Sequence, residues 1–315
     1  MASDANSIRD YSPMALSTAL PTTPRQARRT GTRWEWFLWP AVLISFALLV
    51  FPQINFVWLS FHADLGLGQV SDALTADNYI QLLADPFYLN VFWVTLYLSV
   101  ATAGFGLLVG FPAAYALARI GGSTASLLLS LILTTSLITV VVKLIGLNII
   151  LGSDGVINRV VLGLGLSRVP IAMLNNEFGV FIGLVQYTLP LMIVLLFGVV
   201  QTIPVSLEEA ATILGATRAQ TYWQVIVPSA KAGLLSSGLI AFNMSMGTFT
   251  SVVLLGGGRV RTVPVLIQQI IIQETKYGEG AALSTALVAL AFLINIAVVA
   301  YLFASGRGLR RHRAD

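Results

Sequence analysis

The sequence contains no cysteine, only two histidines and few charged residues, since Asp, Glu, Lys and Arg make up 10% of its 315 positions. The absence of cysteine excludes disulfides, thiolate metal sites and a cysteine nucleophile. Soluble domains carry about a quarter charged residues, so the scarcity of charge excludes a water-soluble globular enzyme. Hydrophobic residues make up 56% of the chain and the mean hydropathy is +0.82. One soluble core of this size cannot bury so much apolar surface, which must therefore face lipid.

Six long intervals contain no Asp, Glu, Lys or Arg. Crossing the hydrocarbon layer takes roughly 20 mainly apolar residues, so each interval is long enough for one crossing and too short for two. Lipid offers no partner for backbone N–H and C=O groups, and a helix satisfies them internally. The sequence therefore predicts an all-α membrane protein with six transmembrane helices. They are expected at about 36–61, 89–118, 124–148, 178–203, 232–256 and 281–305.

The distribution of Lys and Arg predicts the orientation of these helices. Most of these residues fall on the side of the N-terminus, and the positive-inside rule places that side in the cytoplasm. The stretch from His62 to Asn90 falls on the opposite side and carries four Asp residues without a basic companion. Both termini are thus predicted to be cytoplasmic. A permease domain at 34–306 is expected between a disordered basic tail at 1–33 and a short basic tail at 307–315.

Two features inside the predicted helices have open interpretations. Lys143 lies deep in a hydrophobic run and is expected near the outer interface, where it either snorkels to water or takes part in gating or solute contact. Gly106 and Gly110 in the second helix favour close packing against another helix. The following Pro112 either is simply tolerated there or provides a hinge.

Two stretches between the predicted helices are not expected to cross the bilayer. Residues 150–176 are interrupted by charges and predict a helix that lies along the outer interface. Residues 262–273 are short and contain three glutamines. We expect this second stretch to lie flat or to line an aqueous mouth.

The segment between the fourth and fifth predicted helices has the pattern of two short soluble helices. Ser206 followed by Glu209 predicts a capping box, in which each side chain satisfies a free backbone N–H. Gly215 predicts a left-handed stop at the end of this helix. Thr217 and Gln220 repeat the box and predict the start of a second helix.

One face of the first short helix predicts a contact surface. Apolar residues recur there at helical spacing, at Leu207, Ala210, Ala211 and Leu214. An exposed ridge of this kind fits a groove on a soluble partner. The alternative is a ridge that lies on this protein's own helix ends.

The spacing in this segment resembles the EAA loop of membrane subunits of type I ABC importers, E-A-A-x3-G-x9-I-x-L-P. Glu209-Ala210-Ala211 precedes Gly215 at that spacing, and Val225, Val227 and Pro228 follow. Valine replaces the usual Ile and Leu conservatively. The resemblance covers about residues 78–300 and looks closest to the spermidine/putrescine branch. Related branches for ferric iron, oxyanions, phosphonates or opine-like solutes are the alternatives.

The resemblance implies a type I ABC importer permease fold in a bacterial inner membrane, with residues 204–230 as the coupling loop. It implies four other subunits: a second homologous permease, two ABC ATPases and an extracytoplasmic solute-binding protein. The chain itself lacks the Gly-Lys-Ser/Thr of a phosphate-binding loop, so ATP and Mg are expected on the ATPase and neither a cofactor nor a catalytic or metal site on this chain. No nucleic acid partner is expected. The coupling role would fall on Glu208, Glu209, Ala210, Ala211, Leu214, Gly215 and Arg218.

Polar side chains within the predicted helices are candidates for the solute path. They are Lys143, Gln186, Tyr187, Asn243, Thr248 and Thr250. Such groups equally form hydrogen bonds between helices.

No carboxylate lies in these helices, so a secondary transporter that acts alone, which needs ion coupling, is the weaker alternative. A membrane-embedded enzyme is weaker still, because His62 and His312 are expected on opposite sides of the membrane. Without carboxylates here, either the partner permease supplies them or the solute is not a polyamine.

Overall fold

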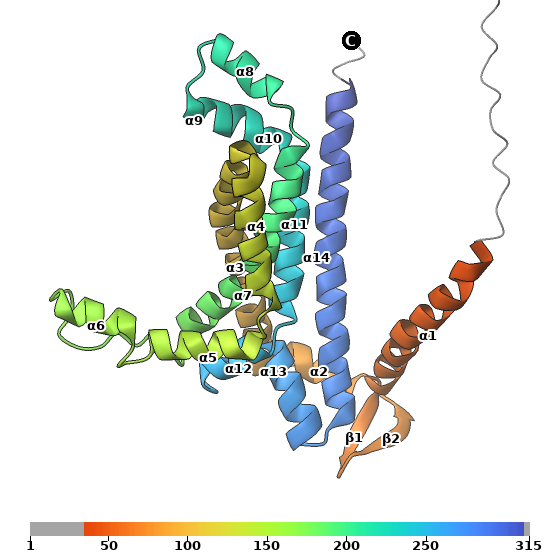
Figure 1. Cartoon of the computed structure of the whole chain (residues 1–315). Coiled ribbons are helices and arrows are strands. Elements are labelled where there is room, and N and C mark those ends of the chain that lie inside the picture. The colour runs from red at the N-terminus through yellow and green to blue at the C-terminus, as the bar shows by residue number, and fades with distance from the viewer. Residues whose placement is uncertain (1–34, 312–315) are drawn as a thin grey trace, which may run out of the picture. The chain divides into compact units, whose positions relative to one another are not determined.

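The computed structural model describes residues 35–311 as a nearly all-helical chain (Figure 1). The expected tail at 1–33 lies outside the described residues. The chain divides into two compact units, one ending at Phe51 and one beginning at Pro52. Helix α1 (Glu35–Leu59) starts in the first unit, and its apolar stretch from Trp39 to Leu59 has a mean hydropathy of 2.0.

The second unit is built on a bundle of long helices that lie side by side (Figure 1). They are α3 (Pro86–Ile120), α4 (Gly122–Leu137), α7 (Glu177–Gln201), α11 (Lys231–Met246) and α14 (Tyr277–Arg311). Buried side chains of α3, α7 and α11 form the main core, among them Phe111, Met192, Leu196 and Phe242. Close van der Waals packing of such side chains, rather than removal of apolar surface from water, holds helices together in a membrane.

Glycines allow the bundle helices to approach closely. A Cβ atom on Gly106 of α3 would lie 2.6 Å from Sδ of Met192 on α7. A Cβ atom on Gly233 of α11 would lie 2.3 Å from Cγ1 of Val199, also on α7. The expected close packing at Gly106 is therefore present, and α3 runs without interruption through Pro112.

The two ends of the bundle carry different short elements (Figure 1). One end, called the loop end below, carries α8 (Ser206–Ile213), α9 (Arg218–Thr221), the π-helix η1 (Tyr222–Ile226) and α10 (Val227–Ser229). The opposite end carries β1 (His62–Gly66), β2 (Gln69–Leu74), α2 (Asp77–Ala84), α12 (Thr250–Gly256), α13 (Val263–Gln268) and the π-helix η2 (Gln269–Gln273). The two strands pair antiparallel, with His62 opposite Leu74 and Gly66 opposite Gln69.

The third and fifth predicted helices are both broken near the end opposite to the loop end. The predicted helix 124–148 is split at Ile138 and Thr139, whose backbone is extended, and α5 (Val140–Leu151) begins after them. The residues around this break are mostly β-branched, which restricts their side chains in a helix and lowers helix propensity. The predicted helix 232–256 is split at residues 247–249, between α11 and α12.

The stretches expected at the outer interface have different environments. Helix α5 and the following α6 (Val156–Gly163) project sideways from the bundle (Figure 1). Residues 262–273, which were expected to lie flat or to line an aqueous mouth, pack into the protein. Val263 and Leu266 are buried, and the backbone N–H of Val263 donates to Oγ1 of Thr95 on α3 at 2.9 Å.

Length and hydropathy allow five helices within the described residues to cross a membrane. The number is six if the pair 218–229 and 231–246, bent by 71°, forms one span. The stretch Val140–Gly163 is among the five by composition, although α5 and α6 run across the bundle while α4 runs along it (Figure 1). Helix α14 is longer than predicted at both ends and includes the start of the expected tail at 307–315. Residues 312–315 of that tail lie outside the described residues.

Gly233→Ala is expected to destabilise the protein, because its new Cβ atom overlaps the branched side chain of Val199. We expect a loss of about 1–3 kcal/mol in the free energy of unfolding. Gly104→Ala is the matched control, since α3 leaves open space around Gly104. Thermal unfolding of the two variants in detergent, followed by tryptophan fluorescence, makes the comparison. Equal midpoints for both variants would contradict the packing described here.

Candidate functional site

The first helix of the coupling loop begins one residue earlier than the sequence pattern predicts. Ser206 is not its N-cap, and the predicted capping box with Glu209 is absent from α8. Instead Val205 already has helical backbone angles, and its carbonyl accepts from the N–H groups of Glu208 and Glu209 at 2.9 and 3.1 Å. Because Pro204 and Val205 start the turn, Ser206 lies inside the helix.

The turn between the two short helices has the predicted chemistry. Gly215 has a φ of +83°, the left-handed conformation that glycine adopts without strain. Its N–H donates to the carbonyl of Thr212, and the next N–H, of Ala216, donates to the carbonyl of Ala211, each at 3.0 Å. These two bonds satisfy carbonyls that the end of α8 leaves free. The angle between the two short helices is therefore fixed at Gly215.

The second capping box is present at the start of α9. The N–H of Gln220 donates to Oγ1 of Thr217 at 3.3 Å, and the N–H of Thr217 donates to Oε1 of Gln220 at 2.8 Å. The following turn widens into η1, and Pro228 then lies in α10. The loop is thus two short helices joined by a rigid turn.

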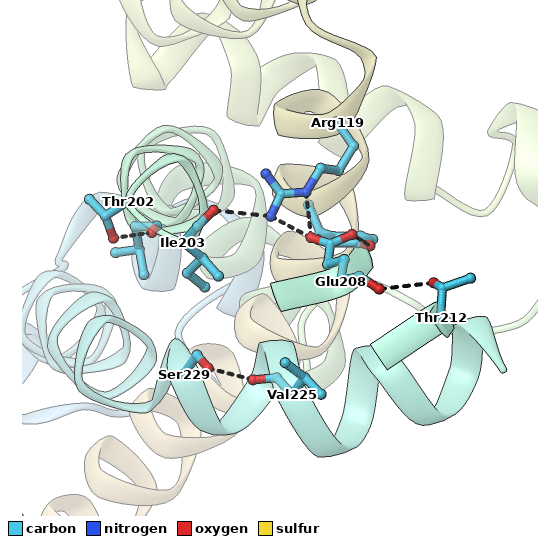
Figure 2. Close-up of polar contacts among 9 residues, drawn as sticks. Arg119, Thr202, Ile203, Glu208, Thr212, Val225 and Ser229 are labelled. Atoms are coloured by element: carbon cyan, nitrogen blue, oxygen red, sulfur yellow. Dashed lines mark hydrogen bonds and ion pairs between the residues drawn. The ribbon is translucent and has the colours of Figure 1, made fainter. Parts of the chain in front are cut away.

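An ion pair joins α8 to the end of α3. Nε of Arg119 donates to Oε1 of Glu208 at 2.6 Å, and Nη2 of Arg119 lies 2.5 Å from the same oxygen. The hydroxyl of Tyr115 donates to Oε2 of Glu208 at 2.8 Å. Figure 2 shows the Glu208 side chain between Arg119 and α8, with Nη2 of Arg119 also reaching the carbonyl of Ile203. The pair is mostly buried, since the side chains of Arg119 and Glu208 are 20% and 17% exposed.

Aromatic and apolar contacts hold the second part of the loop. The ring of Tyr222 in η1 lies 5.6 Å from the ring of Phe111 and 5.4 Å from that of Tyr115. These two α3 residues are four positions apart and so share one face of the helix. Ile226 is completely buried in the main core. Both short helices of the loop are therefore attached to the bundle by the end of α3.

The outward face of α8 differs in part from the predicted ridge. Ala211 is buried against the protein, whereas Leu207, Ala210 and Leu214 are exposed, Leu214 to 87%. Ile213, which the pattern did not single out, is also strongly exposed. Positions three and four apart share a helix face, so the buried Glu208 and Ala211 form the inner face.

The structure places the predicted coupling residues on two sides of the loop. Glu209 and Arg218 are exposed, and Gly215 forms the turn. A cavity of about 380 Å³ lies on the inner side, lined by Tyr115, Arg119, Glu208, Thr212, Arg218 and Thr221. The sequence reasoning missed Arg119 and Tyr115. A signal was available, since Arg119 and Glu208 are the first charges after two long apolar intervals that end on the same side.

Four of the predicted path residues line one cavity of about 410 Å³. Val140, Tyr187, Asn243, Met244, Gly247, Thr248, Phe249 and Thr250 surround it. It lies where α5 starts and where α11 and α12 are broken, so non-helical backbone forms part of its wall. Irregular backbone is tolerated at membrane depth where it lines a cavity. Lys143 and Gln186 lie outside this lining.

Asn243 also has a partner in another helix. Its Nδ2 donates to Oδ1 of Asn295 on α14 at 3.0 Å, and Nδ2 of Asn295 donates back to Oδ1 of Asn243 at 3.0 Å. Thr248 donates to the carbonyl of Met244 at 2.6 Å. Asn243 therefore has the interhelical role that the sequence left open, at the edge of the cavity. Within residues 35–311, no cluster of His, Asp and Glu is suited to hold a metal ion.

Known proteins match this chain over most of its length. A family model described as "Binding-protein-dependent transport system inner membrane component" matches residues 77–311. The spermidine/putrescine transport system permease protein PotB of Haemophilus influenzae is 31% identical over 257 residues, covering 80% of this chain and 90% of that protein. PotB of Escherichia coli is 30% identical over 245 residues, covering 78% of this chain and 88% of the relative.

Solved structures share the fold. A bacterial ABC transporter that imports the acidic polysaccharide alginate matches with a TM-score of 0.66 at 18% identity, over 87% of this chain and 96% of the solved one. The MetNI methionine ABC transporter in an inward-facing conformation matches with a TM-score of 0.53 at 20% identity, over 69% of this chain and 94% of the solved one. The chain belongs to the family of inner membrane components of binding-protein-dependent transport systems, and it is a membrane-embedded permease of an ABC importer.

Proposed function

We propose that this chain forms half of the translocation path of a polyamine importer in a bacterial inner membrane. A second homologous permease supplies the other half, two ABC ATPases supply the energy, and an extracytoplasmic binding protein delivers the solute. The observation that carries the solute class is the 30–31% identity to spermidine/putrescine permeases over about four fifths of the chain. The fold match to an alginate transporter solved with its periplasmic protein supports the kind of assembly.

The proposed topology has six spans with both termini in the cytoplasm. The spans are α1, α3, α4, α7, α11 and α14, and α5 and α6 lie along the outer interface. Helices α4 and α11 have 16 residues each, about 24 Å at 1.5 Å per residue. The broken stretches beside the cavity complete their crossings. Arg119, Arg218 and Lys231 near the loop end support a cytoplasmic position for that end.

The coupling loop is proposed to dock on the ATPase through its outward face. Leu207, Ile213 and Leu214 are exposed apolar side chains on a short helix, and Glu209 adds a carboxylate beside them. An apolar patch with a charged rim is the usual composition of a helix that fits a groove. Closure of the ATPases on ATP then moves α8, and the bundle turns its cavity outward.

The residues that line the cavity indicate which class of solute it suits. Its polar members are Tyr187, Asn243, Thr248 and Thr250, with Phe249 as a second ring. Aromatic faces attract amines by cation–π interaction, but the lining has no carboxylate. We therefore propose that the partner permease supplies the acidic groups. The alternative is an importer of the same class for an oxyanion or an organic anion, which an uncharged lining with Lys143 nearby on α5 favours. Relatives for sulfate and sulfoquinovosyl glycerol match at 25% and 28% identity.

The assembled complex is expected to take up polyamine only when ATP is present. The test reconstitutes the chain with its co-expressed partner permease, ATPases and binding protein into vesicles, with labelled spermidine outside and ATP inside. Excess unlabelled putrescine should inhibit this uptake, and a parallel assay with labelled sulfate separates the two solute classes. Uptake of sulfate without uptake of spermidine would select the anion class. Failure of any ATPase to co-purify in mild detergent would refute the importer assembly.

Glu209→Lys and Gly215→Arg are expected to abolish uptake while the protein still inserts in the membrane. The first reverses a charge on the proposed docking face, and the second forces a bulky side chain into a left-handed turn. ATP hydrolysis and uptake are measured on the same vesicles, and we expect hydrolysis to become uncoupled from transport. Ser123→Lys, an exposed position at the start of α4, controls for added positive charge. Full uptake by both loop variants would contradict the docking role.

Asn243→Leu is expected to lower the stability of the protein, whereas Tyr187→Leu is expected to abolish uptake. Loss of the amide pair should lower the free energy of unfolding by about 1 kcal/mol, as interhelical hydrogen bonds in membranes do. Asn295→Leu should have the same effect, and the double variant should cost less than the sum. Tyr187→Leu should keep its stability and lose uptake. Normal spermidine uptake by Tyr187→Leu would remove this ring from the proposed path.

A further inference from the structure

Glu208 and Glu209 are neighbours in the sequence, yet their carboxylates have opposite surroundings. Both oxygens of Glu208 accept hydrogen bonds from α3. Glu209 is exposed, and its carboxylate has no hydrogen bond or ion pair with residues 35–311. Successive helix residues point about 100° apart, so Glu209 is directed toward solvent while Glu208 is held by α3.

Arg119 connects three segments through one guanidinium group. It lies in the last turn of α3 and binds Glu208 of α8 through two nitrogens. Its Nη2 also donates to the carbonyl of Ile203, in the link between α7 and α8, at 3.4 Å. A planar guanidinium with several bonds restricts rotation far more than a single contact would.

Helix α3 continues from this contact into the centre of the bundle. Gly106 on α3 lies directly against Met192 of α7, and α7 carries Tyr187 of the cavity lining. A displacement of α8 can therefore pass through the packed contacts of α3 and α7 to the cavity. Without Arg119, the Tyr115–Glu208 hydrogen bond, the ring contacts of Tyr222 and the burial of Ile226 would remain, but no ion pair would join α8 to α3.

We propose that Glu208 is a positioning residue whose ion pair with Arg119 transmits the movement of α8 to α3, whereas Glu209 is the carboxylate that meets the ATPase. The proposal rests on the proposed function, because it presupposes an ATPase at the loop. Glu208 thus acts within this chain, although it stands beside the residues expected to bind the partner.

The test uses the assembled complex and the absence of native cysteine. Thr250→Cys places one thiol in the cavity lining, and its maleimide labelling rate is compared without nucleotide and with ATP plus vanadate. With Thr250→Cys as the only substitution, we expect the labelling rate to differ about fivefold or more between these two conditions. Glu208→Gln and Arg119→Gln should keep the ATPase bound and lose most of this change. Arg119→Glu combined with Glu208→Arg should restore it, which a purely structural defect in either residue would not allow.

Glu209→Gln is the matched control, since it removes one charge from the adjacent position. In a salt titration, it should lower the affinity of the chain for the ATPase by about tenfold, whereas Glu208→Gln should leave this affinity unchanged. A full labelling change in Arg119→Gln, or no recovery in the charge-swapped chain, would overturn the transmission role. Equal loss of ATPase from Glu208→Gln and Glu209→Gln would overturn the division between the two glutamates. If even the unchanged chain retains no ATPase, the proposed function fails first, and this inference fails with it.

Discussion

The loop at residues 204–230 is too short to fold around a core of its own, and its attachment to the end of α3 is the contact that fixes its position on the bundle. Arg119 and Tyr115 hold Glu208 on the inner face of α8, while Tyr222 and Ile226 hold the second half. Charge-assisted bonds with little solvent around them are stronger than exposed ion pairs. The two short helices can therefore move together with α3.

This attachment decides which side of the loop is free. With Glu208 and Ala211 turned inward, α8 exposes Leu207, Ala210, Ile213 and Leu214. A soluble protein rarely leaves such side chains uncovered on a short helix. The relatives of this chain are permease subunits of ABC importers, and this face is where we propose that the ATPase acts.

The sequence was sufficient for the membrane class, the turn at Gly215 and the box at Thr217, because each depends on local chemistry or on hydropathy. It did not predict the breaks at 138–139 and 247–249, where hydropathy stays high while β-branched residues and Gly247 end the helices. The predicted N-cap at Ser206 was wrong, because Pro204 and Val205 start the helix earlier. The Arg119–Glu208 pair joins residues far apart in the chain. The sequence shows only that both follow long apolar intervals ending on the same side, and the fold shows that they meet.

The same breaks bring together the polar residues that the sequence could only name one by one. Tyr187, Asn243, Thr248 and Thr250 come from α7, α11 and the start of α12 and meet at one cavity because α11 stops short. Asn243 shows how a residue chosen for a path can also hold two helices together, through Asn295. Polar residues within predicted spans therefore indicated which side chains meet at one cavity, but they did not indicate the role of each side chain.

Site-directed cross-linking in the assembled transporter tests the central claim most directly. A photoreactive amino acid at Leu214, on the outward face of α8, should cross-link to the ATPase in mild detergent. The same photoreactive amino acid in place of Leu67 should not cross-link to the ATPase. Leu67 is 98% exposed and lies in the turn between β1 and β2, at the opposite end of the bundle. Cross-links to the ATPase from position 67 but not from position 214 would contradict the account.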